Sequence, residues 1–330
     1  MDIVNPQERT GMIEPVEEWF PADDGTRLFL RRWIPGEAPW GVLHIVHGMA
    51  EHAGRYDRLA RRLCREGIEV WAADQRGHGR TADRGINDPG RGGLLGHPGD
   101  RGGFARISAD IHAINIRIKT IYPGLPLFIL GHSWGSFITQ YYIEGSPEGL
   151  AGCILSGTRG RMGIKTLLGA PFLSCLAFFR GSRARSRLAW AMADGPFDKP
   201  FRPNRTPFDW LSRDEKEVDA YVADPLCGQR CTLGFYRDLT LLFNRIHKPA
   251  RMEGINRDLP LYIFSGSADP VGDMGNSPTA LVNLYRSMGV KDLEFVLYPG
   301  ARHETLNETN REEVTGDLVA WLNKHRPVRG

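Results

Sequence analysis

The sequence predicts an α/β fold with a mostly parallel central sheet, helices on both faces and an inserted helical cap. Short apolar runs of strand length alternate with segments of helical spacing, which is typical of a parallel sheet buried on both faces. The alternation stops after about Ser156 and resumes at Leu259. The residues between them show helical patches and many prolines but no clear strand run. This interruption predicts that the cap is an insertion into the sheet domain.

The predicted elements follow one another in a regular order. The strands are expected at 16–21, 26–33, 41–47, 68–73, 125–130, 150–156, 259–264 and 293–298. The helices are expected at 56–65, 104–122, 134–144, 277–288 and 311–324. Residues 77–103 are rich in glycine and are predicted to form a loop. The core is therefore expected in two parts, residues 1–157 and 259–330, with the cap at 158–258.

Composition and charge exclude several classes of protein. The chain has 330 residues, 41% of them hydrophobic, and its formal net charge is +3. These values are globular, and the near balance of charge gives no reason to expect a nucleic-acid partner. No apolar stretch reaches the roughly 18 residues that span a bilayer. The first 20 residues lack the pattern of a secretory signal.

The five cysteines form no C-x-x-C pair, which argues against zinc and thioredoxin-like sites. Reduced thiols in the cytoplasm are the default for such a chain, so a cytoplasmic location is expected.

The segment Gly131-His132-Ser133-Trp134-Gly135 carries the sharpest chemical signal. It matches G-x-S-x-G between a predicted strand and a predicted helix, the context of a nucleophile elbow. The two glycines are needed because a side chain there would clash with the tight turn. The N-terminus of the next helix offers free N–H groups to a developing oxyanion. Ser133 is therefore predicted to be a nucleophile. The alternative is an ordinary strand-to-helix turn.

A serine hydroxyl needs a base, and the base needs an orienting acid. In this context the chain order is Ser, acid, His. Asp269 and His303 each follow a predicted strand, at the edge where open α/β sheets hold their sites. Asp273 is the rival acid. His247 in the cap and His325 on the last helix are the rival bases, and both are expected to lie in water.

The segment from His47 to His52 also follows a predicted buried strand. A backbone N–H of this loop is expected to complete an oxyanion hole with the N–H of Trp134. This chemistry needs no metal and no organic cofactor, and neither is expected. The segment from Gly77 to Ala82 fits G-x-G-x-x-A, but the glycine-rich residues that follow it do not resemble the helix that a dinucleotide site requires.

Six pieces of the sequence together resemble the serine α/β-hydrolases of the monoacylglycerol lipase and lysophospholipase type. They are HGMAEHAGRYDRLARRL (47–63), DQRGHGRT (74–81), GHSWGS (131–136), LSRDEKEVDAYVADPL (211–226), GSADP (266–270) and YPGARHE (298–304). They keep the family order over nearly the full length, and one lies in the cap, where unrelated hydrolases rarely agree. The resemblance implies the α/β-hydrolase fold, with Ser133 as nucleophile, Asp269 as acid and His303 as base.

The resemblance also implies roles for residues around the triad. The N–H groups of Met49 and Trp134 would be the oxyanion donors, and Glu51 and Arg55 would lie near the polar glycerol end of the substrate. Two departures concern specificity. Trp134 replaces the usual Met after the nucleophile, and Met49-Ala50 replaces a smaller pair that contains glycine. Both enlarge side chains beside the oxyanion, which puts the acyl or headgroup preference in question.

The expected function is a serine esterase that acts on acyl esters, with monoglycerides first. The alternatives are a lysophospholipase, another carboxylesterase or lactonase, an acyltransferase, and a non-catalytic ligand-binding protein on the same fold. The apolar segment 167–179 is followed by four arginines at 180, 183, 185 and 187. It predicts either peripheral contact of the cap with a membrane or a cap helix packed on the core with its arginines in water. No oligomeric state is predicted.

Overall fold

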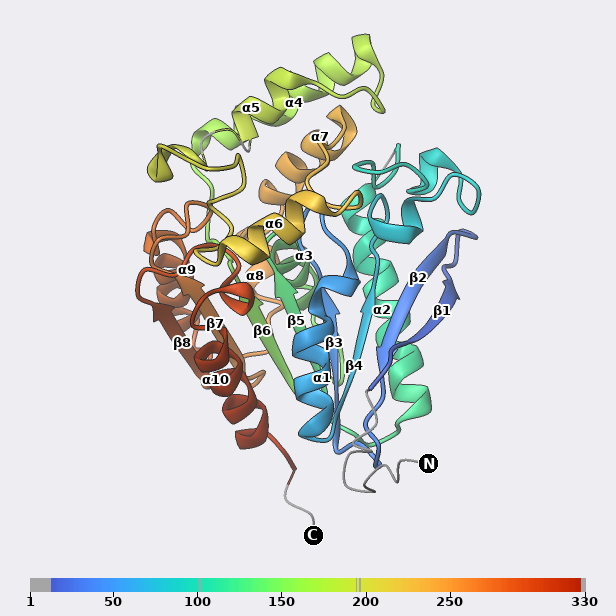
Figure 1. Cartoon of the computed structure of the whole chain (residues 1–330), viewed down its shortest axis with the longest axis vertical. Helices are drawn as coiled ribbons and strands as arrows, with labels where there is room; N and C mark the ends of the chain where they lie inside the picture. The colour runs from blue at the N-terminus through green and yellow to red at the C-terminus, as the bar shows by residue number, and fades with distance from the viewer. Residues whose placement is uncertain (1–12, 101, 194, 196, 328–330) are drawn as a thin grey trace, which may run out of the picture.

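A computed structural model describes residues 13–327, except residues 101, 194 and 196. The prediction that no secretory signal is present depends largely on residues 1–12, which lie outside the described part. The described chain forms one eight-stranded sheet in the order β1-β2-β4-β3-β5-β6-β7-β8 (Figure 1). The strands are β1 Val16–Pro21, β2 Arg27–Trp33, β3 Gly41–Val46, β4 Ile68–Ala73, β5 Leu127–His132, β6 Gly152–Ser156, β7 Leu261–Gly266 and β8 Leu293–Tyr298.

Strand β2 pairs antiparallel with β1 and β4, and the other neighbouring strands pair parallel. The predicted mostly parallel sheet is therefore confirmed. Every residue of β3, β4 and β5 is buried. These strands read as continuous apolar runs because helices cover both of their faces.

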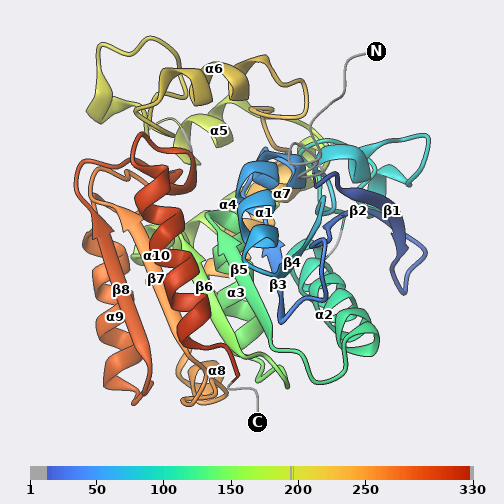
Figure 2. The same ribbon diagram turned by 60° about the horizontal axis from the view of Figure 1, so that its bottom comes forward.

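Two layers of helices cover the sheet. Helices α1 (Asp57–Arg65) and α10 (Arg311–Lys324) pack on one face, where their leucines share a core with residues of β3 to β7. Helices α2 (Gly103–Ile121), α3 (Trp134–Ile143) and α9 (Asn276–Ser287) pack on the other face. Figures 1 and 2 show α1 and α10 on the same side of the sheet. This three-layer arrangement confirms the predicted fold class.

The segment between β6 and β7 forms helices rather than strands in the part that the structure describes. They are α4 Ile164–Arg180, α5 Arg187–Ala193, the short η5 Lys199–Phe201, α6 Glu215–Ala223, α7 Leu233–Phe243 and α8 Pro249–Met252. Figure 1 shows α4 to α7 above the sheet, at the end where the turns after β3 and β5 lie. Residues 158–258 are called the cap segment below.

The glycine-rich residues 77–103 form two short 3-10 turns, η3 Gly79–Ala82 and η4 Pro89–Arg91, before α2 begins at Gly103. The loop prediction is confirmed, and no α-helix follows the G-x-G-x-x-A segment directly. None of the described helices combines the length and the apolar character that a transmembrane span requires.

Candidate active site

Ser133 sits in a strained turn between β5 and α3. Its φ is 50° and its ψ is −122°, a conformation that costs energy for any residue with a side chain. A Cβ on Gly131 would lie 2.7 Å from the carbonyl oxygen of Gly135. A Cβ on Gly135 would lie 2.1 Å from the carbonyl oxygen of Val46. Both glycines are therefore required by close backbone approach, as the G-x-S-x-G pattern predicts.

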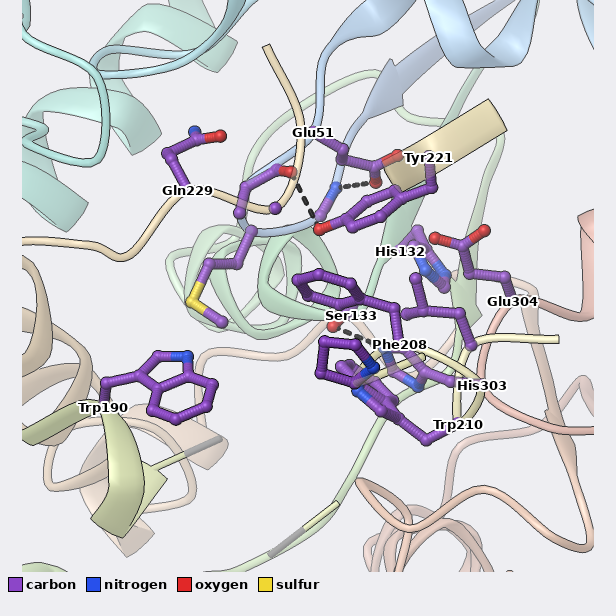
Figure 3. A pocket seen from close by; sticks show the side chains of 16 residues that line it. Glu51, His132, Ser133, Trp190, Phe208, Trp210, Tyr221, Gln229, His303 and Glu304 are labelled. Atoms are coloured by element: carbon purple, nitrogen blue, oxygen red, sulfur yellow. Dashed lines mark hydrogen bonds between the residues drawn. The ribbon is translucent and has the colours of Figure 1, made fainter. Parts of the chain in front are cut away.

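The structure brings Ser133, His303 and Asp269 together from the ends of three strands. The Nε2 of His303 lies 2.7 Å from the Oγ of Ser133, and its Nδ1 lies 2.9 Å from the Oδ1 of Asp269 (Figure 3). Asp269 also accepts hydrogen bonds from the Ser265 hydroxyl and the Val271 amide. This geometry allows His303 to take the Ser133 proton while Asp269 fixes the ring orientation.

Burial and charge act in opposite directions on this pair. Burial alone would lower the pKa of His303, but the charge and hydrogen bond of Asp269 outweigh it and raise the pKa above 6.5. Burial would raise the pKa of Asp269, but His303 and two backbone N–H groups hold that pKa below its usual value. Asp269 therefore remains a carboxylate at neutral pH, and the Nδ1 proton in the hydrogen bond between the two residues stays on His303.

Two backbone N–H groups beside Ser133 have no acceptor in the described part of the chain. They belong to Met49, in the loop after β3, and to Trp134, the first residue of α3. The Trp134 indole packs between the rings of His78 and Phe235, with centroid distances of 4.9 and 5.0 Å. Of the two enlarged side chains, Met49 lines the cavity at Ser133 and Trp134 does not. The larger side chain of Trp134 therefore does not narrow the cavity directly.

Glu51 and Arg55 form a buried charged cluster with Glu304. The two terminal nitrogens of Arg55 lie 2.6 and 2.7 Å from the carboxylate oxygens of Glu304, and one of them lies 2.9 Å from Glu51. Glu51 also accepts from the Gly48 amide and from the Tyr56 hydroxyl. Burial would raise the pKa of Glu304, but Arg55 lowers it to about 2. The cluster thus ties the loop after β3 to the residue that follows His303.

A small cavity opens at Ser133 under the cap segment. Glu51 and Glu304 lie on one side of it and Trp190 and Gln229 on another, with Ser133 at its base (Figure 3). Its free volume is about 50 Å³. Ligand sites for drug-sized molecules are about 300–1,000 Å³. The cavity is therefore too small for a long acyl chain, and Ser133 is half-buried at its base.

The structure separates the triad residues from their rivals. Asp273 is exposed and makes no side-chain hydrogen bond to the described residues, whereas Asp269 is fully buried. The prediction that His247 lies in water is wrong, because its ring is buried and bonds to Gln140. The same prediction for His325 is also wrong, since its ring is half-buried and bonds to Asp292 and Trp321. Neither ring bonds to Ser133 or to Asp269.

The sequence predicted apolar rings of the cap, Trp210 among them, for the acyl pocket, but it placed neither Trp210 nor Glu304 beside His303. Glu304 directly follows His303 in the sequence. An acidic residue next to a predicted base could have been recognised as a candidate site residue. Trp210 lies in the cap segment, where its ring centroid is 5.1 Å from that of His303 and its carbonyl accepts the His303 N–H at 3.4 Å. No periodic pattern in the cap segment could have placed that ring on the triad.

One group of described residues has the composition of a metal site. Ligand atoms of His52, Asp224 and Cys227 lie within 4.8 Å of one another. The two ring nitrogens of His52 are already engaged, because Nε2 lies 2.8 Å from Asp224 and Nδ1 accepts from the Gly54 amide. Burial also raises the pKa of the Cys227 thiol and disfavours the thiolate. These residues therefore form a hydrogen-bonded cluster that does not favour a metal.

Comparison with known proteins places this geometry in a family. The family described as serine aminopeptidase, S33, matches residues 37–310. A monoacylglycerol lipase of Mycolicibacterium smegmatis is 30% identical over 312 residues, which cover 94% of this chain and 97% of that protein. The human monoglyceride lipase is 28% identical, with 91% of this chain and 86% of that protein covered.

A solved structure agrees with this relationship. The carboxyl esterase from Bacillus coagulans, in complex with glycerol, has a TM-score of 0.86 at 27% identity and covers 95% of this chain and 99% of its own. The match over most of the length includes the cap segment as well as the sheet. The chain therefore belongs to the serine α/β-hydrolases of the monoacylglycerol lipase family, and it is an ester hydrolase.

Proposed function

We propose that the protein hydrolyses monoglycerides to glycerol and fatty acid through an acyl-enzyme on Ser133. His303 takes the proton of the Ser133 hydroxyl as the oxygen attacks the ester carbonyl. The N–H groups of Met49 and Trp134 hold the resulting oxyanion. His303 then gives its proton to the leaving glycerol oxygen. A water molecule repeats the two steps on the acyl-enzyme and releases the acid.

The observation that carries this proposal is the joint geometry at Ser133. The hydroxyl lies 2.7 Å from a histidine that is bonded to a buried carboxylate. Two backbone N–H groups beside it, of Met49 and Trp134, are free to donate. The names of the relatives, monoacylglycerol and monoglyceride lipases, support the choice of a glycerol ester over a peptide.

We assign the cap segment, residues 158–258, to the acyl chain, and the two parts of the core to the chemistry. Phe208, Trp210 and Trp190 line the cavity with apolar surface. The free volume requires these rings to move apart before a long acyl chain enters. Glu51 and Glu304, both bonded to Arg55, line the polar side of the cavity and would face the glycerol end.

The test is hydrolysis of glycerol monoesters of rising acyl length by the purified protein, with lysophospholipids and short-chain lactones alongside. We expect turnover of medium and long monoglycerides, and a fall of at least about 10³-fold in kcat in Ser133→Ala. Turnover limited to lysophospholipids or lactones would reject the glycerol ester as substrate and leave the esterase intact. Acyl transfer to an alcohol with no free acid released would identify an acyltransferase.

We further propose that the cap segment rests on an anionic lipid surface. Phe178 and Phe179 at the end of α4 are 83% and 78% exposed, and Leu188 and Met192 on α5 are also exposed. Arg180 and Arg187 flank them and are exposed, with no partner among the described residues. Exposed aromatic rings beside free cations suit the boundary of anionic headgroups and acyl chains. The cytoplasmic location itself stays a prediction from the sequence.

Co-sedimentation with vesicles tests this contact. The parent should bind vesicles that contain phosphatidylglycerol more tightly than neutral vesicles, and Phe178→Ser with Phe179→Ser should weaken both. The matched control is Ile116→Ser on α2, because Ile116 is 51% exposed but lies outside the cap segment. Equal binding by the parent and the cap variant would reject the proposed surface.

A further inference from the structure

Four buried polar side chains connect the cap segment to the backbone of Ser133. They are Ser136 and Gln140 on α3, Thr158 just after β6, and His247 near the end of the cap segment. The first three are fully buried, and His247 is 3% exposed. None of them lines the cavity at Ser133. Polar groups buried together usually have a structural or functional purpose, because each costs free energy when its partner is lost.

The four side chains form a continuous chain of hydrogen bonds. The Nε2 of His247 lies 2.5 Å from the Oε1 of Gln140. The Nε2 of Gln140 lies 2.8 Å from the Thr158 hydroxyl, which lies 2.8 Å from the Ser136 hydroxyl. The Ser136 hydroxyl lies 2.6 Å from the carbonyl oxygen of Ser133.

The direction of every proton in this chain follows from its two ends. The Ser133 carbonyl can only accept, so the single proton of the Ser136 hydroxyl points to it and the Thr158 hydroxyl donates to Ser136. The Gln140 amide nitrogen also donates to the carbonyl of Arg159, which fixes the orientation of that amide. Its oxygen therefore accepts, and the Nε2 of His247 carries the proton. All donors consequently point toward Ser133.

His247 is suited to stand at the start of this chain. Burial, followed by the charge of Arg161, lowers its pKa to about 4, so the ring is neutral at physiological pH. Its backbone N–H donates to Glu144, and its carbonyl accepts from Arg161. These contacts fix His247 between α3 and the first residues of the cap segment.

The carbonyl at the end of the chain belongs to the same peptide unit as the Trp134 N–H. A hydrogen bond accepted by a peptide oxygen polarises that unit and makes its N–H a stronger donor, and aligned bonds reinforce one another. We propose that His247, Gln140, Thr158 and Ser136 act as positioning residues that orient and polarise the Ser133–Trp134 peptide toward the oxyanion. This role rests on the proposed function, in which the Trp134 N–H is an oxyanion donor.

The size of the effect is bounded by the other bonds at the same oxygen. The Ser133 carbonyl also accepts the N–H groups of Ser136 and Phe137, at 2.8 and 3.2 Å. Loss of a whole oxyanion donor costs roughly 10²–10³-fold in kcat, and cooperative strengthening is a fraction of one bond. Removal of the Ser136 hydroxyl should therefore lower kcat/KM about three- to tenfold.

A double-variant cycle tests the chain. Ser136→Ala and Thr158→Val should each lower kcat/KM for a short p-nitrophenyl ester. The double variant should be no slower than Ser136→Ala, because Thr158 acts only through the Ser136 hydroxyl. The matched control is Thr139→Val, which removes a buried hydroxyl of α3 that bonds to the Gly135 carbonyl and should leave kcat/KM unchanged. Effects that multiply in the double variant, or no loss in Ser136→Ala, would overturn the proposal.

A second readout separates this role from a general loosening of the site. A short trifluoromethyl ketone forms an oxyanion on Ser133, so its Ki should rise by the same factor as kcat/KM falls. The matching ether forms no oxyanion and should bind all variants equally, and equal loss of ether binding would overturn the proposal. Where Ser136→Ala does not fold, Thr158→Val with Gln140→Met gives an equivalent cycle. Failure of the ketone to bind the parent would instead reject the proposed function.

Discussion

The sheet core and the cap segment hold their functional side chains in different ways. Asp269 and His303 leave the ends of β7 and β8 in buried turns, where backbone and side-chain hydrogen bonds fix each group. Trp190 and Trp210 of the cap segment are only half-buried; Trp210 contacts the rings of Phe197 and His303, and the Arg230 guanidinium lies over the Trp190 ring. The core therefore holds its polar side chains by hydrogen bonds, whereas the cap segment presents half-buried aromatic rings. Under the proposed function, the core carries the chemistry and the cap segment carries the selectivity.

The two regions meet through a few backbone bonds at the site. The Gly228 N–H and the Tyr221 hydroxyl, both in the cap segment, donate to the carbonyl of Ala50 at 2.9 and 3.0 Å. The Glu304 N–H donates to the carbonyl of Leu211 at 2.8 Å. These bonds join the cap segment to the loop after β3 and to the loop that carries His303. Substitutions on either side should therefore show which region controls rate and which controls selectivity.

The largest effect should come from the buried acid of the core. Asp269→Asn removes the charge that orients and stabilises His303, and kcat should fall about 10³- to 10⁴-fold. Asp273→Asn is the matched control, since Asp273 lies on the same loop but is exposed. Its kcat should stay within about twofold of the parent. Steady-state kinetics with a short ester measures both, and a large loss in Asp273→Asn alone would reverse the assignment.

The next effect should be on stability rather than on rate. Arg55→Met leaves Glu51 and Glu304 buried without their cation, which should lower the free energy of unfolding by about 3–5 kcal/mol. Arg58→Met, three residues further on in α1, breaks a more exposed pair with Glu217 and should cost at most about 1 kcal/mol. Urea unfolding compares the two. A stable Arg55→Met with a raised KM for monoglycerides would show that Arg55 mainly binds substrate.

The pH dependence should report the charge balance at His303. The base must be unprotonated to act, and Asp269 raises its pKa above 6.5. The value of kcat/KM should therefore fall about tenfold per pH unit below a midpoint that lies above 6.5, and reach a plateau above it. A pH profile of short-ester hydrolysis gives the midpoint. A midpoint at or below 6.5 would contradict the raised pKa.

The smallest effect should come from the cap segment. Trp210→Ala removes a half-buried ring over His303 and enlarges the cavity, so the ratio of long-chain to short-chain kcat/KM should rise about two- to fivefold. Hydrolysis of a series of monoglycerides, with thermal unfolding alongside, measures this ratio. An unchanged ratio together with a large loss of rate on every ester would show that Trp210 supports His303 rather than shapes the acyl pocket.

The sheet and the triad were predictable because their signals are local. A parallel strand covered on both faces is mostly apolar, so β3 to β7 appear as nearly continuous apolar runs with bounds within a few residues of those observed. The nucleophile turn needs Gly131 and Gly135 because backbone atoms approach each other closely there. Ser133, Asp269 and His303 each follow a parallel strand of the same sheet, β5, β7 and β8, and so meet at one edge of it.

The sequence alone thus predicted the fold class, the position of Ser133, Asp269 and His303 after strands, and their order along the chain. Only the tertiary structure decided which distant polar groups pair inside the protein. Arg55 meets Glu304 across 249 positions and His247 meets Gln140 across 107. Such pairs leave no periodic trace, because a buried polar group is satisfied by whatever the fold brings within hydrogen-bonding distance. The position of the cap segment over Ser133 was likewise decided by tertiary packing, such as that of the Trp210 ring on His303.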